Sequence, residues 1–185
     1  MKSLTLPASM YGHGQVTGTV RLHIAAKAGG TVVQLASSNP ALTVPDSLTV
    51  PEGQYSTTFE AFSSDVSTMA NPTVTASAGG TSATAGVTVN PLTVSALTLS
   101  SATAVSGSMV SITVTLNTAV AVATTVSLAS ADGGLVPVPS TLSFPAGSKT
   151  ATITVTLGST ATAKNVRITA TKNGTVQYRT LKVNP

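Results

Sequence analysis

The sequence predicts an all-β protein made of two tandem β-sandwich domains, and three observations predict it. Residues 44–53 (VPDSLTVPEG) return 94 positions later as residues 138–147 (VPSTLSFPAG). Ser and Thr make up 56 of the 185 residues, and both Thr and Val favour strands, because their branched side chains fit a pleated surface and lose rotamer freedom in a helix. No segment keeps an apolar period of 3.6 residues, so we expect no helix.

The repeat sets the domain boundaries. Val89-Asn90-Pro91 returns as Val183-Asn184-Pro185, the last three residues. A period this long indicates two copies of one domain rather than an array of short repeats. We therefore expect domain 1 at residues 1–91 and domain 2 at residues 92–185, joined by a short linker at residues 90–96.

Turn signals divide each copy into about seven strands. In domain 1 we expect strands near residues 4–6, 15–24, 31–36, 42–50 (broken at Pro45), 55–62, 72–77 and 82–89. In domain 2 we expect them near residues 97–99, 109–116, 124–129, 135–144 (broken by prolines), 149–157, 165–171 and 175–183. Seven short strands at this spacing favour an immunoglobulin-like sandwich over a closed barrel.

The last two strands of each domain form a predicted hairpin. Asn173-Gly174 supplies two residues that tolerate positive φ, as a two-residue type I′ turn requires, and Gly79-Gly80 is the counterpart in domain 1. Pairing outward from the turn places Ile168 opposite Arg179 and Val166 opposite Leu181. An arginine opposite an apolar residue indicates either a cation at the rim of the sandwich or a bulge near Thr180. Because Gly86 is the counterpart of Thr180, we expect the bulge.

Charge is sparse and unequally divided. Charged residues make up 8% of the chain and aromatic residues 3%. Domain 1 has three cations and four acids, a net charge of −1, whereas domain 2 has six cations and one acid, a net charge of +5. Five of these cations lie on the predicted last hairpin: Lys164, Arg167, Lys172, Arg179 and Lys182. They can contact an acidic partner or simply form a solvated face. Nucleic acid is a poor candidate, because only Tyr178 accompanies them.

The residues that could carry chemistry are few and dispersed. There is no cysteine, and the two histidines, His13 and His23, have no metal-ligand spacing. No catalytic or phosphate-binding motif is present, so we expect no enzyme activity, no cofactor and no metal site. Tyr11 and His13 lie in a glycine-flanked loop that we expect to have no equivalent in domain 2. With the five cations of the last hairpin, they are the candidate partner contacts.

Both copies resemble the bacterial immunoglobulin-like tandem repeats of large surface proteins. The resemblance rests on residues 44–53, on Thr75-Ala76-Ser77-Ala78-Gly79-Gly80 and on Val87-Thr88-Val89-Asn90-Pro91, with their domain 2 counterparts. It covers nearly the whole chain. It implies a non-enzymatic module, since such repeats serve as spacers, adhesive tips and decorations on phage particles, and it carries over no catalytic residue.

Two settings follow from these expectations. The first is a phage virion, where the chain would be a capsid decoration or tail-associated protein that binds capsid or tail proteins and is multimeric through the symmetry of the particle. It is favoured by a start at Met1 and by the lack of an export signal or membrane span. The alternative is a fragment of a secreted bacterial adhesin or stalk that binds a host receptor or glycan at the cell surface.

Overall fold

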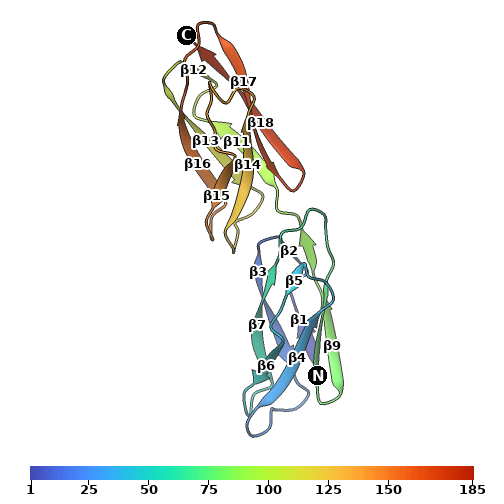
Figure 1. The fold of residues 1–185 in the computed structure, drawn as a ribbon. Helices are drawn as coiled ribbons and strands as arrows, with labels where there is room; N and C mark the ends of the chain where they lie inside the picture. Colours follow the sequence, from blue (N-terminus) through green and yellow to red (C-terminus); the bar gives the residue numbers. More distant parts are fainter. The chain divides into compact units, whose positions relative to one another are not determined.

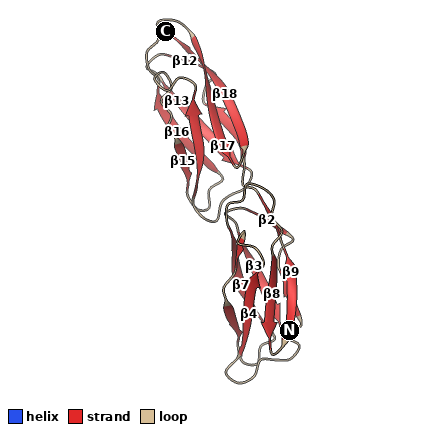
Figure 2. Cartoon of the chain, turned by 45° about the vertical axis from the view of Figure 1, so that its right-hand side comes forward, coloured by secondary structure: helices blue, strands red, loops and turns tan.

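The computed structural model describes residues 1–185 and divides into two compact units, Met1–Pro91 and Leu92–Pro185 (Figure 1). The division falls at the residue where the sequence repeat ends. Every regular element is a strand, and no helix is present (Figure 2). The prediction of an all-β fold built from immunoglobulin-like sandwiches is confirmed.

Domain 1 folds as two antiparallel sheets and one parallel strand pair. One sheet has the order β1-β3-β7-β5 and the other β6-β4-β8-β9, while β10 pairs in parallel with β2. The strands are β1 (Ser3–Thr5), β2 (Ser9–Tyr11), β3 (Gln15–Arg21), β4 (Thr31–Ser37), β5 (Leu42–Thr43), β6 (Ser47–Val50), β7 (Ser56–Ser63), β8 (Thr73–Ala78), β9 (Thr81–Gly86) and β10 (Thr88–Asn90).

Domain 2 has the same arrangement, with fewer interruptions in its strands. Its sheets have the orders β11-β13-β16 and β12-β18-β17-β14-β15, and β12 pairs in parallel with β18. The strands are β11 (Val94–Leu99), β12 (Thr103–Val105), β13 (Met109–Leu116), β14 (Thr124–Ser130), β15 (Thr141–Phe144), β16 (Thr150–Thr156), β17 (Lys164–Lys172) and β18 (Thr175–Asn184).

The predicted strands are confirmed with five corrections. The strand expected at 82–89 is divided at Val87 into β9 and β10, which belong to different sheets. β3 ends at Arg21 rather than at residue 24, and β11 begins at Val94 rather than at residue 97. Of the strand expected at 135–144, only β15 forms, because prolines interrupt the segment before it. The short strands β2 and β12 were missed. Each has three residues and pairs in parallel with the end of the last strand of its domain, so no local alternation marks it.

Each domain has its own apolar core between its two sheets. Phe144, Ile112 and Ile168 are fully buried in domain 2. Leu92 and Val94, which we expected to be linker residues, also belong to this core and are 0% and 1% exposed. Burial of these two apolar side chains draws the chain into domain 2. The segment between β10 and β11 is therefore shorter than the expected linker and comprises residues 91–93.

Both predicted hairpins are confirmed. Lys172 pairs with Thr175 across Asn173 and Gly174, which have φ angles of 47° and 77°. Ala78 pairs with Thr81 across Gly79 and Gly80, with φ angles of 54° and 75°. Two positive φ angles in a two-residue loop match a type I′ turn.

The register of the last hairpin is also confirmed, but the bulge is not. Ile168 pairs with Arg179 and Val166 with Leu181. Pairing continues without a shift through Thr180, so the expected bulge is wrong. Arg179 is exposed, and its guanidinium lies at the rim, where Nη1 donates to the carbonyl oxygen of Tyr178 at 2.8 Å.

Candidate functional site

The first candidate contact site is a turn between β2 and β3 that carries Tyr11 and His13. Tyr11 ends β2 and is 41% exposed. The backbone N–H of Gly14 donates to the carbonyl oxygen of Tyr11 at 3.1 Å and closes the turn. His13 is the third residue of this turn and has a φ of 56°, a left-handed conformation that is uncommon outside glycine but in which Asn, Asp and His are enriched.

Ser63 holds this turn against the end of β7. It is the buried polar residue of the chain, 5% exposed. Its hydroxyl donates to the carbonyl oxygen of Tyr11 at 2.6 Å and accepts from the N–H of Gly14 at 2.9 Å. The serine hydroxyl therefore satisfies two backbone groups at once. Nothing in the local sequence around Ser63 pointed to this role, because the turn it supports lies far away in the chain.

The expectation that this loop has no equivalent in domain 2 is wrong. Residues 105–108 form the same turn 94 positions later, with Ser108 N–H donating to the carbonyl oxygen of Val105 at 3.1 Å. Gly107, with a φ of 77°, occupies the place of His13. The sequence comparison missed this because no position of the two turns holds the same residue in both copies. Domain 1 therefore places an imidazole where its duplicate has only a hydrogen atom.

His13 contacts Asp65 in the loop after β7. Nε2 of His13 lies 3.4 Å from Oδ2 of Asp65, and the two side chains are 19% and 33% exposed. The chain contains no group of three or more His, Cys, Asp or Glu side chains that could hold a metal ion. His23 lies elsewhere, in the segment between β3 and β4.

The five cations of the β17–β18 hairpin, which we call the basic hairpin, do not share one face. Val166, Ile168 and Ala170 of β17 are buried, so the residues that alternate with them face outward. Arg167 is on this outward face, over the ring of Tyr178 at 4.0 Å from its centroid. Lys182 pairs with Asn165 and shares this face.

The other three cations lie around the rim of the sandwich. Lys164 is at one end of β17, 3.5 Å from the carboxylate of Asp132. Lys172 is at the other end, and its Nζ donates to the hydroxyl of Thr124 at 3.0 Å. Lys164 and Lys172 are the first and last of the nine residues of β17, so at about 3.3 Å per residue their Cα atoms are roughly 26 Å apart. Arg179 occupies the position between them. The basic hairpin is thus a dispersed positive ribbon rather than a compact anion site.

Asp132 is the acid of domain 2, and it organises the loop after β14. Its Oδ1 accepts from the backbone N–H of Leu135 at 3.0 Å, and its carbonyl oxygen accepts from the N–H of Val136 at 2.8 Å. The hydrogen bond from Leu135, followed by the charge of Lys164, lowers the pKa of Asp132 below its ordinary value of 3.8. This acid is used to fix a loop next to β17.

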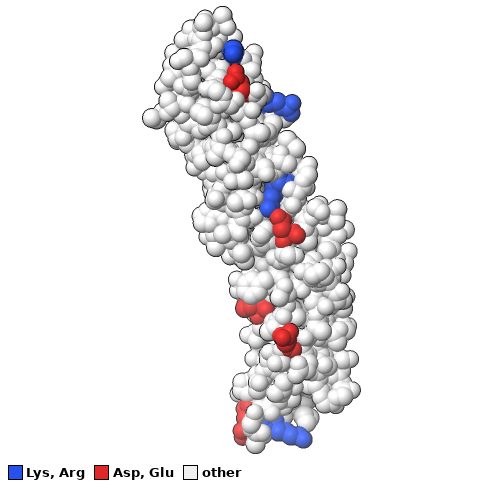
Figure 3. Space-filling view, in the orientation of Figure 1, with Lys and Arg blue, Asp and Glu red and all other residues white.

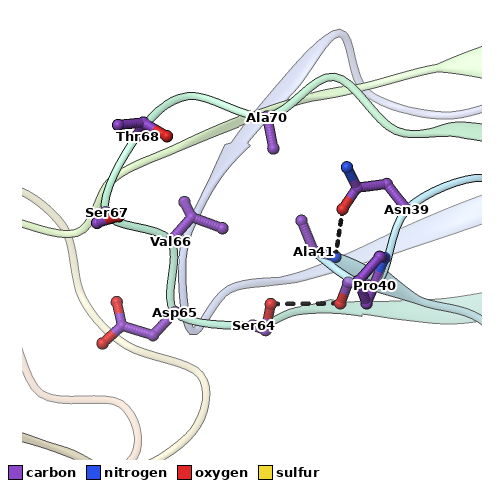
Figure 4. Close-up of a pocket in the computed structure, with 9 residues that line it drawn as sticks. All are labelled: Asn39, Pro40, Ala41, Ser64, Asp65, Val66, Ser67, Thr68 and Ala70. Atoms are coloured by element: carbon purple, nitrogen blue, oxygen red, sulfur yellow. Dashed lines mark hydrogen bonds between the residues drawn. The ribbon is translucent and has the colours of Figure 1, made fainter.

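A shallow cavity of about 330 Å³ lies between the loop after β4 and the loop after β7 (Figure 4). Its polar groups are already engaged in the loops, since the N–H of Ala41 donates to Asn39 Oδ1 at 2.8 Å and Ser64 Oγ donates to the carbonyl oxygen of Pro40 at 3.3 Å. In Figure 4 the carboxylate of Asp65 points away from the cavity. No polar side chains converge on a common point here, as an active site requires.

The remaining surface is poor in charge. Figure 3 shows only scattered Lys, Arg, Asp and Glu side chains among uncharged atoms on the face in view. Hydroxyl groups replace them on the sheets: Ser111 contacts Thr154 at 2.9 Å and Thr113 contacts Thr152 at 2.8 Å, oxygen to oxygen. No helix that is long and apolar enough to cross a membrane occurs in the fold.

The sequence matches no protein-family profile and no curated protein. Among solved structures, the Yersinia pseudotuberculosis adhesin InvE is 18% identical with a TM-score of 0.45, and the match covers 98% of this chain and 59% of InvE. The I9–I11 tandem of titin is 9% identical with a TM-score of 0.49, covering 98% and 66%. Domains 4 and 5 of the S-layer protein SbsC are 18% identical with a TM-score of 0.38, covering 98% and 95%. The chain thus spans less than two thirds of the first two structures.

Proposed function

We propose that this chain is a non-enzymatic structural or adhesive module that is displayed on the surface of a larger assembly and binds a protein partner through domain 2. The observation that carries the proposal is the charge difference between two copies of one fold. Duplication alone yields equal charge, yet domain 2 carries +5 and domain 1 carries −1. Five of the six cations of domain 2 lie on one hairpin, which is suited to an extended acidic surface on a protein scaffold.

The dispersed geometry of the basic hairpin decides what kind of binding to expect. Exposed charge pairs contribute about 0–1 kcal/mol each and are screened beyond about 8–10 Å at physiological salt. Lys164 and Lys182 lie near one end of the hairpin and Lys172 lies at the other end, so the three lysines cannot bind one small anion together. They act together on a broad acidic face, and their effect is cumulative and greatest on the association rate.

A triple variant tests this mode of binding. Neutralising Lys164, Lys172 and Lys182 to Gln should slow association with the isolated particle or its purified scaffold at low salt, with a smaller difference at high salt. Surface plasmon resonance at two ionic strengths measures both rates. A matched control neutralises Lys2, Arg21 and Lys27 of domain 1. Equal association rates for the triple variant and the wild type at low salt would contradict the proposal.

The turn at Tyr11 and His13 is a second point of contact, because domain 1 displays there an aromatic ring and an imidazole that domain 2 lacks. Changing Tyr11 and His13 together to Ala should increase the dissociation rate from the partner while the circular dichroism spectrum stays unchanged. His13→Gly alone, which installs the residue found at Gly107, separates the imidazole from the backbone conformation. An unchanged dissociation rate in the double variant would reduce the turn to a connection.

A phage virion is the setting that we propose, as a capsid decoration or tail-associated component, and a bacterial cell surface is the alternative. Antibodies against the purified chain distinguish the two. Labelling of purified particles in electron microscopy, together with the chain's presence in their protein content, supports the virion. Labelling of intact bacterial cells in the absence of particles supports the adhesin or stalk.

A further inference from the structure

An apolar pocket of about 540 Å³ lies at the end of domain 1 where Met1 is found. Met1 lines this pocket, and its ammonium group donates to Oγ1 of Thr81 at the start of β9 (Figure 1). The rest of the lining comes from the segment after β3, which includes Leu22 and His23, and from the β8–β9 turn, which includes Gly79. The volume is in the range of pockets that bind small ligands or single side chains, about 300–1,000 Å³.

The duplicated fold identifies the equivalent place in domain 2. β1 pairs with β3 as β11 pairs with β13, and Leu4 takes the place of Leu97. Three residues earlier, Met1 takes the place of Val94, and both side chains are buried. The two residues before Val94 therefore have their counterpart positions before Met1, outside the 185 residues.

In domain 2 these two residues are built into the fold. Leu92 is buried in the core, and its carbonyl oxygen accepts from Nδ2 of Asn173 at 2.9 Å. Thr93 exchanges two hydrogen bonds with Asn117. The N–H of Asn117 donates to the carbonyl oxygen of Thr93 at 3.0 Å, and the N–H of Thr93 donates to Oδ1 of Asn117 at 3.2 Å.

The counterparts of both anchoring residues line the pocket of domain 1. Gly79 takes the place of Asn173 in the hairpin turn, and His23 takes the place of Asn117 just after the equivalent strand. Both are lining residues. The N–H of His23 has no backbone partner, whereas the corresponding N–H of domain 2 is bonded. The pocket is thus the counterpart of the place that residues 92–93 fill in domain 2.

The charges around the pocket favour a negatively charged ligand. The ammonium group of Met1 and the side chain of Lys27 belong to the lining, and no Asp or Glu does. In domain 2 the chain continues from residue 93 through a peptide bond to Val94. A segment bound to domain 1 in the same direction meets the ammonium group of Met1 at that point. This arrangement suits the carboxyl end of a chain, since a contact of about 2.8 Å in place of a bond of about 1.3 Å requires a shift of only about 1.5 Å.

We propose that this pocket binds the extended carboxyl end of a partner protein whose next-to-last residue has a leucine-like side chain. That side chain lies against Leu22 and Met1, as Leu92 lies in the core of domain 2. One carboxylate oxygen accepts from the N–H of His23, and the other lies beside the ammonium group of Met1. The inference goes beyond the proposed function and does not depend on it, because it concerns domain 1.

A short peptide should bind this pocket weakly. The gain comes from one buried aliphatic side chain and two charge-assisted hydrogen bonds, and it is offset by the loss of freedom of the peptide. We expect a dissociation constant of about 0.1–1 mM. A partner that is held close to domain 1 by a larger assembly binds at a lower bulk concentration.

Titration of the full chain with acetyl-Asn-Pro-Leu-Thr, followed by two-dimensional NMR, tests the proposal. The peptide has the sequence of residues 90–93 and a free carboxylate. The amide signals of His23 and Gly79 should shift and saturate, while those of Asn117 and Asn173 stay unchanged. Replacing the leucine of the peptide by alanine should weaken binding at least tenfold. Amidation of its carboxyl end should weaken binding at least threefold.

Variants of β8 and its turn test the position of the peptide. Gly79→Asn restores the side chain that bonds Leu92 in domain 2, and asparagine tolerates the φ of 54° at this position. It should tighten binding about two- to tenfold. Ala78→Leu extends an apolar side chain into the pocket and should abolish binding. Ser77→Leu is the matched control on the opposite face of β8 and should leave binding unchanged.

Several results would overturn the proposal. One is the absence of saturable shifts up to about 10 mM peptide, and another is binding that survives Ala78→Leu or is unaffected by amidation. A Gly79→Asn variant that binds no more tightly than the wild type also overturns it. Mass spectrometry of the protein from its native source is a separate test, because residues found before Met1 would remove the ammonium group and fill the pocket from the same chain.

Discussion

At Gly18 an aromatic ring fills the space that a side chain would need, and Gly18→Ala is the sharpest test of how the duplicated core was repacked. Gly18 pairs with Phe59 across β3 and β7. A Cβ atom at Gly18 would lie 2.3 Å from Cζ and 2.6 Å from Cε1 of Phe59. The ring is 6% exposed, so it has little space to move. In domain 2 the same two positions hold Ile112 and Ile153, which pair without a glycine.

The destabilisation of domain 1 by Gly18→Ala is the difference between two opposing effects. Inserting a methyl group into a packed core costs about 1–3 kcal/mol. Replacing glycine inside a strand recovers about 0.5–1 kcal/mol, because the unfolded chain loses freedom. The net destabilisation of domain 1 should be about 1–2 kcal/mol. For a domain of this size each kcal/mol lowers Tm by about 4–8 °C, so the transition of domain 1 should fall by about 4–16 °C.

Differential scanning calorimetry of the full chain measures this shift, with the unchanged domain 2 as the internal reference. The decisive comparison is a double-mutant cycle with Phe59→Leu, which removes the ring atoms that the new methyl group would meet. In that background Gly18→Ala should be neutral or stabilising. If Gly18→Ala costs the same in the Phe59→Leu background as in the wild type, the ring is not the reason for the glycine and the argument is refuted.

Two further predictions concern domain 2. The pKa of Asp132 is lowered on folding, so its contribution to stability is present above its unfolded pKa and is lost as the pH falls through the lower folded value. The difference in urea midpoint between wild type and Asp132→Asn should therefore be constant near about pH 6 and shrink below about pH 4; a difference that stays constant down to about pH 2.5 would refute it. Asn173 has a φ of 47° and donates from Nδ2 to the carbonyl oxygen of Leu92 at 2.9 Å. Asn173→Ala should lower the free energy of unfolding by about 1–2 kcal/mol, measured by urea denaturation, and Asn173→Gly should lower it less. An equal loss in both variants would show that the side-chain hydrogen bond, and not the positive φ, is the cause.

The sequence by itself determined those features that depend on neighbours in the chain. The hairpin at Asn173-Gly174 and its register could be predicted, because a type I′ turn needs two positive φ angles and pairing outward from it allows one alignment. The alternation of β16 showed which of its residues face the core. The 94-residue repeat indicated the duplication. For the candidate contacts, the sequence placed the five cations on one hairpin.

Only the tertiary structure decided features that depend on residues far apart in the chain. β2 and β12 exist because they pair with the last strand of their domains, and Ser63 fixes the turn at Tyr11 through contacts from the end of β7. Side-chain alternation along β17 and β18 places some cations of the basic hairpin on the outward face and others at the rim, and the length of β17 keeps Lys164 and Lys172 apart. The local sequence determines whether a segment favours the extended conformation of a strand. Which other strand pairs with its edge is decided by the packing of the whole domain.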